Sequence, residues 1–489
     1  MIYDAIIVGA GMGGLSVGSL LAKQGKKILI LEAARVPGGC SSSFIRKGYI
    51  FESGATTIMG FDDKQPLQYL QKTLGIHLPI TAIEPAMTVW LHKKPIVRYK
   101  DIHKWIAEAQ KAFGQPEQQE KFWRLCYKIS QLVWKVALKN KYFPPQNLRD
   151  WLYLITHNNP LDAFWLRYSF ISVRDMLKKM KLHTNPDFTR FIDEQLMITA
   201  QNTAEHVNMF IGAAMLCYTN YTNYYSWGGL ISFVSAFAQY IEQHQGQILY
   251  ESKVKSITYQ NEVYYVQTDK GQVYAAKQVI TNLPIWNLPE IVQIPELQAE
   301  FKQKIQKRNQ YWSAFSVGIA IQDVLPKNLT LHHQIILDEP IPFLNSHSIF
   351  VSISHPEDKI RSTNGIRVIN ISTHAPNPVQ WFEPNFDVRK KKEELHQYIL
   401  KALHEYFPYF KPEHILYTHA STPKTWQKWV FRKNGNVGGV PQSMSIKPWQ
   451  MLSPVTRHKN FFICGDTVYP GQGIAGVALS GILTYERMK

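Results

Sequence analysis

An α/β fold is predicted by three glycine-rich segments, each of which adjoins short apolar strands. They lie within residues 1–75, 226–290 and 441–489. Strands that are apolar throughout, rather than alternating, are typical of parallel sheets that helices cover on both faces.

The composition limits the class of protein. The chain has 489 residues, of which 45% are hydrophobic and 19% are charged, so it can bury a sizeable core and is not intrinsically disordered. Its 54 lysines and arginines against 37 acidic residues give a net charge of +17. A charge of that size indicates a nucleic acid, an anionic membrane or acidic ligands as partners, and composition does not choose among them.

The cysteines and the apolar runs exclude several kinds of protein. Cys40, Cys126, Cys217 and Cys464 form no CxxC pair, so neither a zinc or redox motif nor a disulfide scaffold is predicted. The N-terminus enters an apolar strand and lacks the features of a signal peptide. No run of about 18 apolar residues is present, so no transmembrane helix is expected. We therefore expect a cytoplasmic protein without a metal site.

The first 32 residues follow the order of a dinucleotide-binding unit. The apolar strand 3–8 precedes Gly9, Gly11 and Gly14, which match GxGxxG, and a helix and a second strand follow. The three glycines permit, in turn, the tight turn, the approach of the backbone to a pyrophosphate and the packing of helix on strand. Glu32 ends the second strand, where it can accept hydrogen bonds from ribose hydroxyls. Its charge would repel a 2′-phosphate, which disfavours NADP.

The C-terminal end carries a second glycine motif of another kind. An apolar strand at 460–464 precedes Gly465–Asp466, and Gly471, Gly473 and Gly476 again match GxGxxG. Too little chain follows Gly476 for a return strand and a second ribose-binding acid. The motif therefore predicts a strand, an acid and the N-terminus of a final helix, rather than a second dinucleotide unit.

Three stretches resemble the family of FAD-dependent carotenoid cis–trans isomerases and bacterial-type phytoene desaturases, within the amine oxidase-like flavoprotein superfamily. They are residues 38–44 (GGCSSSF) with 48–54 (GYIFESG), residues 422–425 (TPKT) leading to Gly435 and Gly438–Gly439, and residues 465–473 (GDTVYPGQG). The resemblance covers nearly the full chain and is closer to the isomerases. It is weak in 76–225 and 291–420, where substrate identity would be decided.

The resemblance implies a Rossmann-type FAD-binding domain, with the GR2-like flavoprotein fold, interleaved with an α+β substrate domain. The FAD-binding parts are expected at 1–75, 226–290 and 441–489. The substrate domain is expected at 76–225, which would also face the membrane, and at 291–440.

The resemblance also implies the cofactor and the residues around it. Amine oxidases proper often carry a cysteine that links to the flavin; the matching loop at Tyr469–Pro470 has none, so FAD is expected to bind non-covalently, with Cys464 in the core. The N-terminus of the last helix is expected to stabilise negative charge on the pyrimidine ring of the reduced flavin. The implied residues are Gly38 and Gly39 along the pyrophosphate and ribityl chain, Val254 near the adenine, Gly465 and Asp466 at the ribityl hydroxyls, and Gly473 and Ile474 at the last helix.

The segment 139–183 is rich in basic and aromatic residues. Basic groups are attracted to anionic lipid headgroups and aromatic rings favour the membrane interface, so the segment fits a membrane-docking face. A solvated basic face over an ordinary aromatic core explains it equally well. No nucleic-acid-binding module is recognisable. The basic residues are Lys139, Lys141, Arg149, Arg167, Arg174, Lys178, Lys179 and Lys181, and the aromatic residues are Tyr142, Phe143, Trp151, Tyr153, Phe164, Trp165, Tyr168 and Phe170.

Two further groups leave alternatives open. His206 beside Glu205 is either an acid–base pair or an ordinary histidine, and no catalytic residue is assigned. An aromatic cluster either lines an apolar tunnel to the flavin or packs beneath a sheet. Its members are Tyr218, Tyr221, Tyr224, Tyr225 and Trp227.

Taken with the resemblance, the sequence predicts an FAD-dependent oxidoreductase that desaturates or isomerises a long apolar polyene. The alternatives are a retinoid-type saturase, an amine or other small-metabolite oxidase, and a non-catalytic flavin-binding partner protein. The expected partners are the polyene and a membrane surface, to which the charge of +17 would attach the protein peripherally, and no nucleic acid. The oligomeric state is left open.

Overall fold

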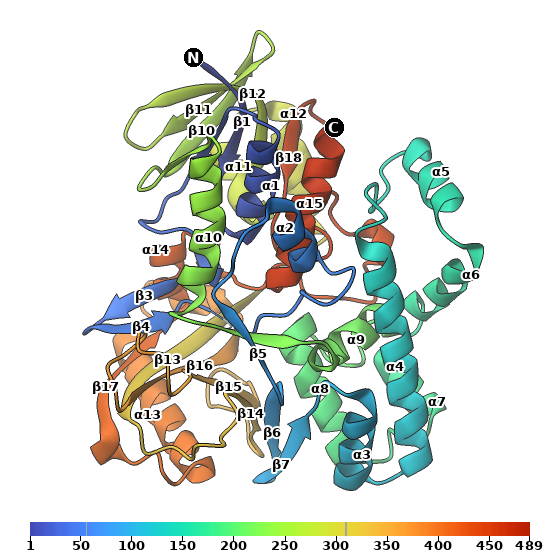
Figure 1. Ribbon diagram of the computed structural model, residues 1–489, viewed down its shortest axis with the longest axis vertical. Helices are drawn as coiled ribbons and strands as arrows, with labels where there is room; N and C mark the ends of the chain where they lie inside the picture. Colours follow the sequence, from blue (N-terminus) through green and yellow to red (C-terminus); the bar gives the residue numbers. More distant parts are fainter. Residues whose placement is uncertain (55, 309–310) are drawn as a thin grey trace.

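The computed structural model describes residues 1–54, 56–308 and 311–489. It contains two seven-stranded sheets, one in the upper and one in the lower part of Figure 1, and a layer of helices beside them. Parallel and antiparallel strand pairs both occur, and the predicted α/β fold is confirmed.

The first sheet is built from three distant parts of the chain. The strands that run parallel to β1 come from the N-terminal part of the chain, from its middle and from its C-terminal end. In spatial order its strands are β10 (Val254–Gln260), β11 (Val263–Thr268), β12 (Val273–Thr281), β1 (Ile2–Val8), β2 (Ile28–Leu31) and β9 (Gln247–Leu249), with β18 (Phe461–Ile463) pairing with β12.

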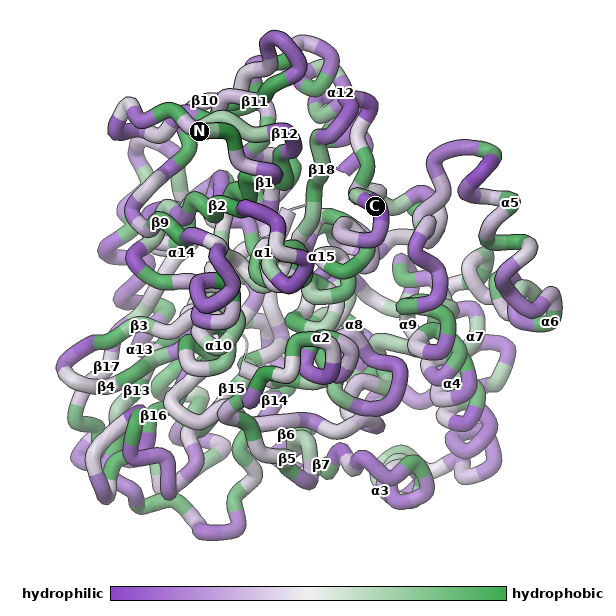
Figure 2. Tube along the Cα trace, turned by 45° about the horizontal axis from the view of Figure 1, so that its top comes forward, coloured by the Kyte–Doolittle hydropathy of each residue, from purple (hydrophilic) through white to green (hydrophobic). Residues whose placement is uncertain are grey.

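Strand β1 lies inside the sheet, between β12 and β2, and hydrophobic residues cover both of its faces. Ala5 and Ile7 point into one hydrophobic cluster, whereas Ile6 and Val8 point into the cluster on the opposite face. An apolar run without alternation is what such a strand requires. Figure 2 shows β1 and β18 as predominantly hydrophobic strands.

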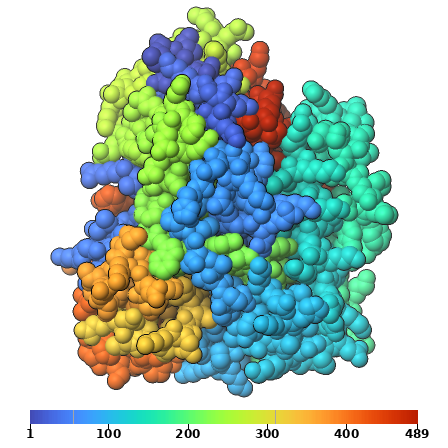
Figure 3. All heavy atoms as spheres, viewed as in Figure 1, coloured from blue at the N-terminus to red at the C-terminus, as the bar shows by residue number. Residues whose placement is uncertain are grey.

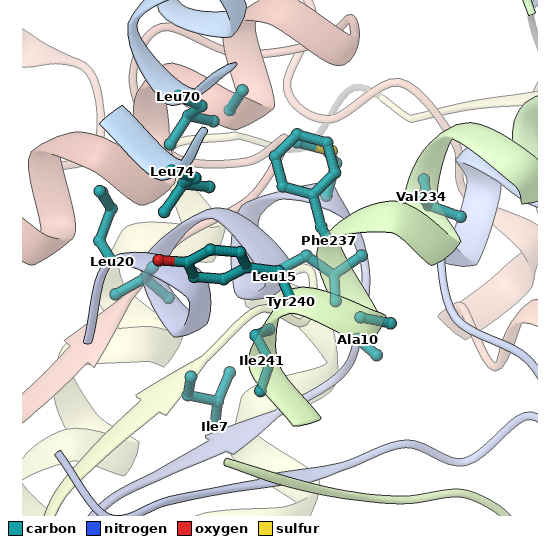
Figure 4. Packing of buried hydrophobic residues seen from close by; sticks show 14 of the residues in the cluster. Ile7, Ala10, Leu15, Leu20, Leu70, Leu74, Val234, Phe237, Tyr240 and Ile241 are labelled. Atoms are coloured by element: carbon teal, nitrogen blue, oxygen red, sulfur yellow. The ribbon is translucent and has the colours of Figure 1, made fainter. Parts of the chain in front are cut away.

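Helices cover one face of the first sheet, and shorter helices cover the other. In Figure 4, side chains of α1, α2 and α10, such as Leu15, Leu70 and Phe237, interlock above Ile7 of β1. The covering helices are α1 (Met12–Lys23), α2 (Pro66–Leu74), α10 (Leu230–Gln243) and α15 (Ile474–Met488) on one face, and α11 (Leu288–Ile291) and α12 (Pro295–Gln306) on the other.

The second sheet is antiparallel except for the pair β14–β6, and α13 (Val388–Tyr406) packs against its hydrophobic face. His332 and His333 on β14 are almost fully buried. Burial lowers the pKa of His332 to about 4 and that of His333 to about 3, because the protonated rings would lose their hydration. In order the strands are β17 (Ile415–Ser421), β13 (Trp312–Gln322), β16 (Ile366–Pro376), β15 (Ser348–Ile353), β14 (His332–Ile336), β6 (Met87–Leu91) and β7 (Lys94–Arg98).

A layer of helices packs against β6 and β7 and fills the right side of the face seen in Figure 3. Arg98, at the end of β7, is fully buried in this layer, 4.1 Å from the ring of Trp105, and donates hydrogen bonds to Gln195 and to the carbonyl of Leu216. The helices are α3 (Ile102–Phe113), α4 (Pro116–Ala137), α5 (Leu148–His157), α6 (Pro160–Ala163), α7 (Val173–Lys179), α8 (Pro186–Ala200) and α9 (Met209–Leu216).

Two small sheets and one helix connect these parts. The hairpin β3 (Ser43–Arg46) and β4 (Tyr49–Glu52) and the pair β5 (Ile80–Ile83) and β8 (Asn223–Ser226) lie between the two large sheets, and α14 (Pro423–Val430) follows β17. Within the described ranges, no helix combines the length and the apolar composition needed to cross a bilayer.

The buried histidines predict an acid-sensitive fold. Their pKa values in the folded chain lie below the unfolded value of about 6.5, so the stability they contribute is complete above pH 6.5 and is lost as pH falls toward 4. We expect the free energy of unfolding in urea to fall by about 1–2 kcal/mol per histidine between pH 7 and pH 5. His333→Gln should reduce this fall, and His183→Gln, an exposed position, should not. Equal pH dependence of both variants would contradict the assignment.

Candidate functional site

Four parallel strands of the first sheet end at the same level. Val8 of β1 pairs with Leu31 of β2 and with Thr281 of β12, and Thr281 pairs with Ile463 of β18. The residues that follow these strands therefore meet at one edge of the sheet. In open α/β sheets this edge, outside the carboxyl ends of the strands, is where ligands bind.

The glycine turn after β1 is tightly enclosed by the protein itself. Gly9 has a φ of +98°, and a Cβ on Gly14 would lie 2.2 Å from the Gly9 carbonyl, so helix α1 can pack on β1 only without a side chain there. A Cβ on Gly11 would lie 2.5 Å from Nδ2 of Asn282, the residue after β12. Gly11 therefore makes room for Asn282 in this structure, in addition to the pyrophosphate that the motif predicts.

The loop at Gly38–Gly39 lies directly beside this turn. The amide of Gly38 donates to the carbonyl of Ala10 at 2.8 Å, and Gly38 forms a parallel bridge with Gly11. A Cβ on Gly39 would lie 3.8 Å from the Cα of Gly11, its nearest neighbour, which is ordinary van der Waals contact.

Glu32 is buried at the end of β2 and accepts hydrogen bonds from the amides of Ala10 and Ala34, both at 2.7 Å. Burial raises the pKa of its carboxyl, and the amides oppose that rise. The carbonyl of Glu32 accepts from the amide of Ser252, which brings the start of β10 alongside. Val254, the first residue of β10, is buried in the hydrophobic cluster beneath the sheet.

Three helices of this region begin after a glycine, and only one has its N-terminus filled by the protein. At α10 the amide of Leu230 donates to the Glu52 carboxylate at 3.1 Å, and that of Ile231 donates to Ser43 Oγ. Helices α1 and α15 begin after Gly11 and Gly473 without a side-chain cap. Their first amides and their positive dipole ends are available to an anion or a polar ring.

The C-terminal motif meets the glycine turn and a loop that follows α14. The amide of Gly465 donates to Ser480 Oγ at 3.2 Å, and Asp466 forms an ion pair with Arg432 at 2.6 Å. A Cβ on Gly439 would lie 2.0 Å from the carbonyl oxygen of Asp466. The stretch that contains Arg432 and Gly439 is therefore part of this edge.

The donors and acceptors at this edge fit a dinucleotide that carries polyhydroxylated groups. Uncapped amides at α1 suit a pyrophosphate, and the carboxylates of Glu32 and Asp466 suit hydroxyl groups. Gly473 has no atom within 4 Å of the position of a Cβ, so the N-terminus of α15, which begins at Ile474, is approachable.

The five residues of the aromatic cluster lie in different surroundings. Tyr218 and Tyr221 pack into the helical layer, where Tyr221 shares a hydrogen bond with Ser130 at 2.9 Å. Tyr224 packs on Phe61, whereas the hydroxyl of Tyr225 donates to Asp358 at 2.7 Å. Their separation follows from β8, because successive residues of a strand point to opposite faces.

Other sequence predictions have definite places. Glu205 and His206 are both exposed, outside this edge. Cys464 is fully buried, which confirms its expected place in the core. The sequence motifs do not predict Arg432 and Asn282 as site residues. Arg432 lies within the motif of residues 422–439, and Asn282 follows the end of a predicted strand.

Much of the basic–aromatic segment, residues 139–183, projects from the molecule. Figure 1 shows α5 and α6 at the edge of the helical layer, and Figure 2 shows polar and apolar stretches alternating along them. Ile155, Leu161 and Phe164 are 68%, 75% and 58% exposed. Arg149 and Arg167 lie exposed among them, with the Arg167 guanidinium 3.6 Å from the centre of the Phe164 ring.

Comparisons with known proteins agree with this geometry. Residues 12–488 match the profile of the family described as flavin-containing amine oxidoreductase. The chloroplastic prolycopene isomerase of Daucus carota is 27% identical over 99% of this chain and 80% of its own length. All-trans-retinol 13,14-reductase of Danio rerio is 26% identical over 98% of this chain and 85% of its own length. A putrescine oxidase solved with putrescine has a TM-score of 0.67 at 14% identity, over 100% of this chain and 99% of that chain, which shows the same fold.

The open N-terminus of α15 yields a prediction. Gly473 and Gly114 both have positive φ and free space for a Cβ, but Gly114 lies at the end of α3, outside this edge. Gly473→Ala and Gly114→Ala should each lower the free energy of unfolding by about 1–2 kcal/mol through backbone strain. Only Gly473→Ala should weaken flavin binding, by about tenfold, as measured by quenching of flavin fluorescence. An unchanged affinity would place the flavin away from α15.

Proposed function

This chain belongs to the flavin-containing amine oxidoreductase family, and on that premise we propose that it binds FAD non-covalently and isomerises or desaturates a long apolar polyene of the carotenoid class. The observation that carries the proposal is the similarity to prolycopene isomerases across almost the entire chain. The similarity includes the parts outside the first sheet, which in an enzyme of this architecture would hold the substrate.

The edge of the first sheet supports FAD as the form of the flavin. Glu32 and Asp466 stand at the ends of two different strands, β2 and β18, with the glycine turn of β1 between them. Glu32 would accept from the adenosine ribose and Asp466 from the ribityl chain, while the amides of α1 bind the pyrophosphate. The residues proposed to hold FAD are Gly9, Gly11, Gly14, Glu32, Gly38, Gly39, Val254, Gly465, Asp466, Gly473 and Ile474.

The cysteines support non-covalent binding. Cys464 is fully buried, 3.6 Å from Oδ1 of Asn282, and burial raises the pKa of its thiol. Cys40 lies on the loop beside the glycine turn, and burial raises the pKa of its thiol too. Because the thiolate is the nucleophile, neither residue is prepared to attack a flavin.

The chemistry divides between cofactor and protein. Bound flavin would supply a two-electron carrier that can accept or donate a hydride equivalent. The protein would bind the dinucleotide along the edge of the first sheet, orient it through α15, and exclude water with the buried layers around it. We propose that the second sheet, with helices α3–α9, forms the substrate domain.

The basic–aromatic segment supports attachment to a membrane surface, where an apolar polyene would reside. Exposed apolar side chains such as Ile155, Leu161 and Phe164 can enter the headgroup region, and neighbouring arginines can pair with anionic lipids. A solvated basic face does not by itself require large exposed apolar side chains. We therefore favour the membrane over the alternative of a solvated face.

A retinoid-type saturase is the second candidate. It is favoured by the similarity to all-trans-retinol 13,14-reductase, which also spans 98% of this chain. A saturase would consume reducing equivalents, whereas an isomerase leaves the oxidation state of its substrate unchanged. The amine oxidases among the solved structures share the fold at 14% identity, which carries no preference for an amine.

The proposed function is tested by expressing the chain in bacterial strains that accumulate different polyenes and analysing the pigments. We expect a poly-cis carotene to be converted to its all-trans isomer, or a carotene to gain double bonds. Strains fed all-trans-retinol provide the comparison, and a dihydro product there would favour the saturase. Unchanged pigments in every strain, with FAD-loaded protein present, would contradict a polyene substrate.

The membrane attachment is tested separately on purified protein. The triple variant Ile155→Ser, Leu161→Ser, Phe164→Ser should bind vesicles of anionic phospholipid at least about tenfold more weakly, because each side chain contributes about 1.5 kcal/mol or more when it is buried. Its melting temperature should not fall, since all three side chains are exposed.

A matched control replaces three apolar side chains exposed elsewhere: Val273→Ser, Val379→Ser, Leu416→Ser. This control should bind the vesicles like the parent protein. If both triple variants bind equally, the basic–aromatic segment is not the docking face.

A further inference from the structure

Arg432 lies where three parts of the candidate site meet. Its guanidinium donates to Oδ2 of Asp466 at 2.6 Å, and its Nε donates to the carbonyl of Asn436. Cys40 is near enough to influence the Arg432 guanidinium electrostatically. The residue is only 9% exposed. It therefore connects the end of β18 with the segment that follows α14, and lies beside the loop of the glycine pair.

Two carboxylates of the site would repel a bound pyrophosphate, and Arg432 offsets the charge of one of them, Asp466. Glu32 and Asp466 are both carboxylates, and they stand at the edge where a pyrophosphate, itself an anion, would bind. A carboxylate is a good acceptor for hydroxyl groups, but in a half-dry site its charge opposes a nearby phosphate. An ion pair with a guanidinium removes that opposition while leaving lone pairs on the carboxylate for further hydrogen bonds.

A second buried arginine–carboxylate pair shows the difference between a closed and an open arrangement. Arg361 pairs with Glu52 at 3.1 Å, and the oxygens of Glu52 also accept from Ser43 and from the amide of Leu230. The carboxylate of Asp466 is arranged differently. Arg432 donates to its Oδ2, and within the described part of the chain no group donates to its Oδ1. The remaining oxygen of Asp466 is thus left for a ligand.

We propose that Arg432 is the cofactor-positioning residue of this site. Its guanidinium neutralises Asp466, so that the second carboxylate oxygen can accept a hydrogen bond from a hydroxyl group of FAD beside the pyrophosphate. The inference rests on the proposed function in one respect, because it takes the ligand to be FAD.

The test measures the dissociation constant of FAD, by fluorescence quenching, for purified full-length variants. Arg432→Met removes the charge and should raise the dissociation constant at least about tenfold, because Asp466 is left unpaired beside the pyrophosphate. Arg432→Lys keeps a cation and should restore most of the affinity. The double variant Arg432→Met, Asp466→Asn removes both charges and should bind FAD more tightly than Arg432→Met alone.

A matched control separates positioning from general stability. Arg174 forms an ion pair of the same length with Asp193, in the helical layer. Arg174→Met should lower the melting temperature without changing the dissociation constant of FAD. Where Arg432→Met does not fold, Arg432→Gln, which retains hydrogen-bond donors, takes its place with the same expected weakening.

The outcomes distinguish failure to bind FAD from the lack of a positioning role for Arg432. If the unaltered protein binds no FAD, the proposed function fails. If it binds FAD but Arg432→Met or Arg432→Gln binds equally well, Arg432 has no positioning role. If the double variant binds more weakly than the single variant, the neutralisation of Asp466 by Arg432 is wrong.

Discussion

The common end of four parallel strands is the constraint on which the rest of the structure depends. Thr281 pairs with both Val8 and Ile463, so strands from the N-terminal, central and C-terminal parts of the chain end at one level. The glycine turn, Glu32, Asn282 and Asp466 each begin within three residues of the end of a strand of this set. A slip of one residue in any of these pairings would turn the side chains of that strand to the opposite face and remove its contribution to the site.

The tight interior of this edge restricts which residue types fit there. Asn282 occupies the space that a Cβ on Gly11 would need, and the carbonyl of Gly9 occupies the space of a Cβ on Gly14. The protein thus uses its own backbone and one amide side chain to hold the turn, and leaves the first amides of α1 open. The contrast with α10, where Glu52 fills the helix N-terminus, shows that an open end is not a general property of the glycine-started helices here.

Sequence alone could predict those features whose determinants are local. The strand, turn, helix and acid from residue 3 to Glu32 lie within one supersecondary unit, and the strand before Asp466 is marked by its apolar run. Arg432 could not be found in this way, because its partner lies 34 residues further on and is reached only once the fold is closed. The five aromatics between Tyr218 and Trp227 are close in sequence, yet β8 sends Tyr224 and Tyr225 to opposite sides.

The proposal that this edge holds FAD is tested most directly by a crystal structure of the full-length protein purified with its bound flavin. We expect the pyrophosphate at the N-terminus of α1 beside Gly39, a ribityl hydroxyl on Asp466 opposite Arg432, and the flavin ring at the N-terminus of α15. A flavin bound elsewhere, or one whose phosphates lie away from α1, would contradict it.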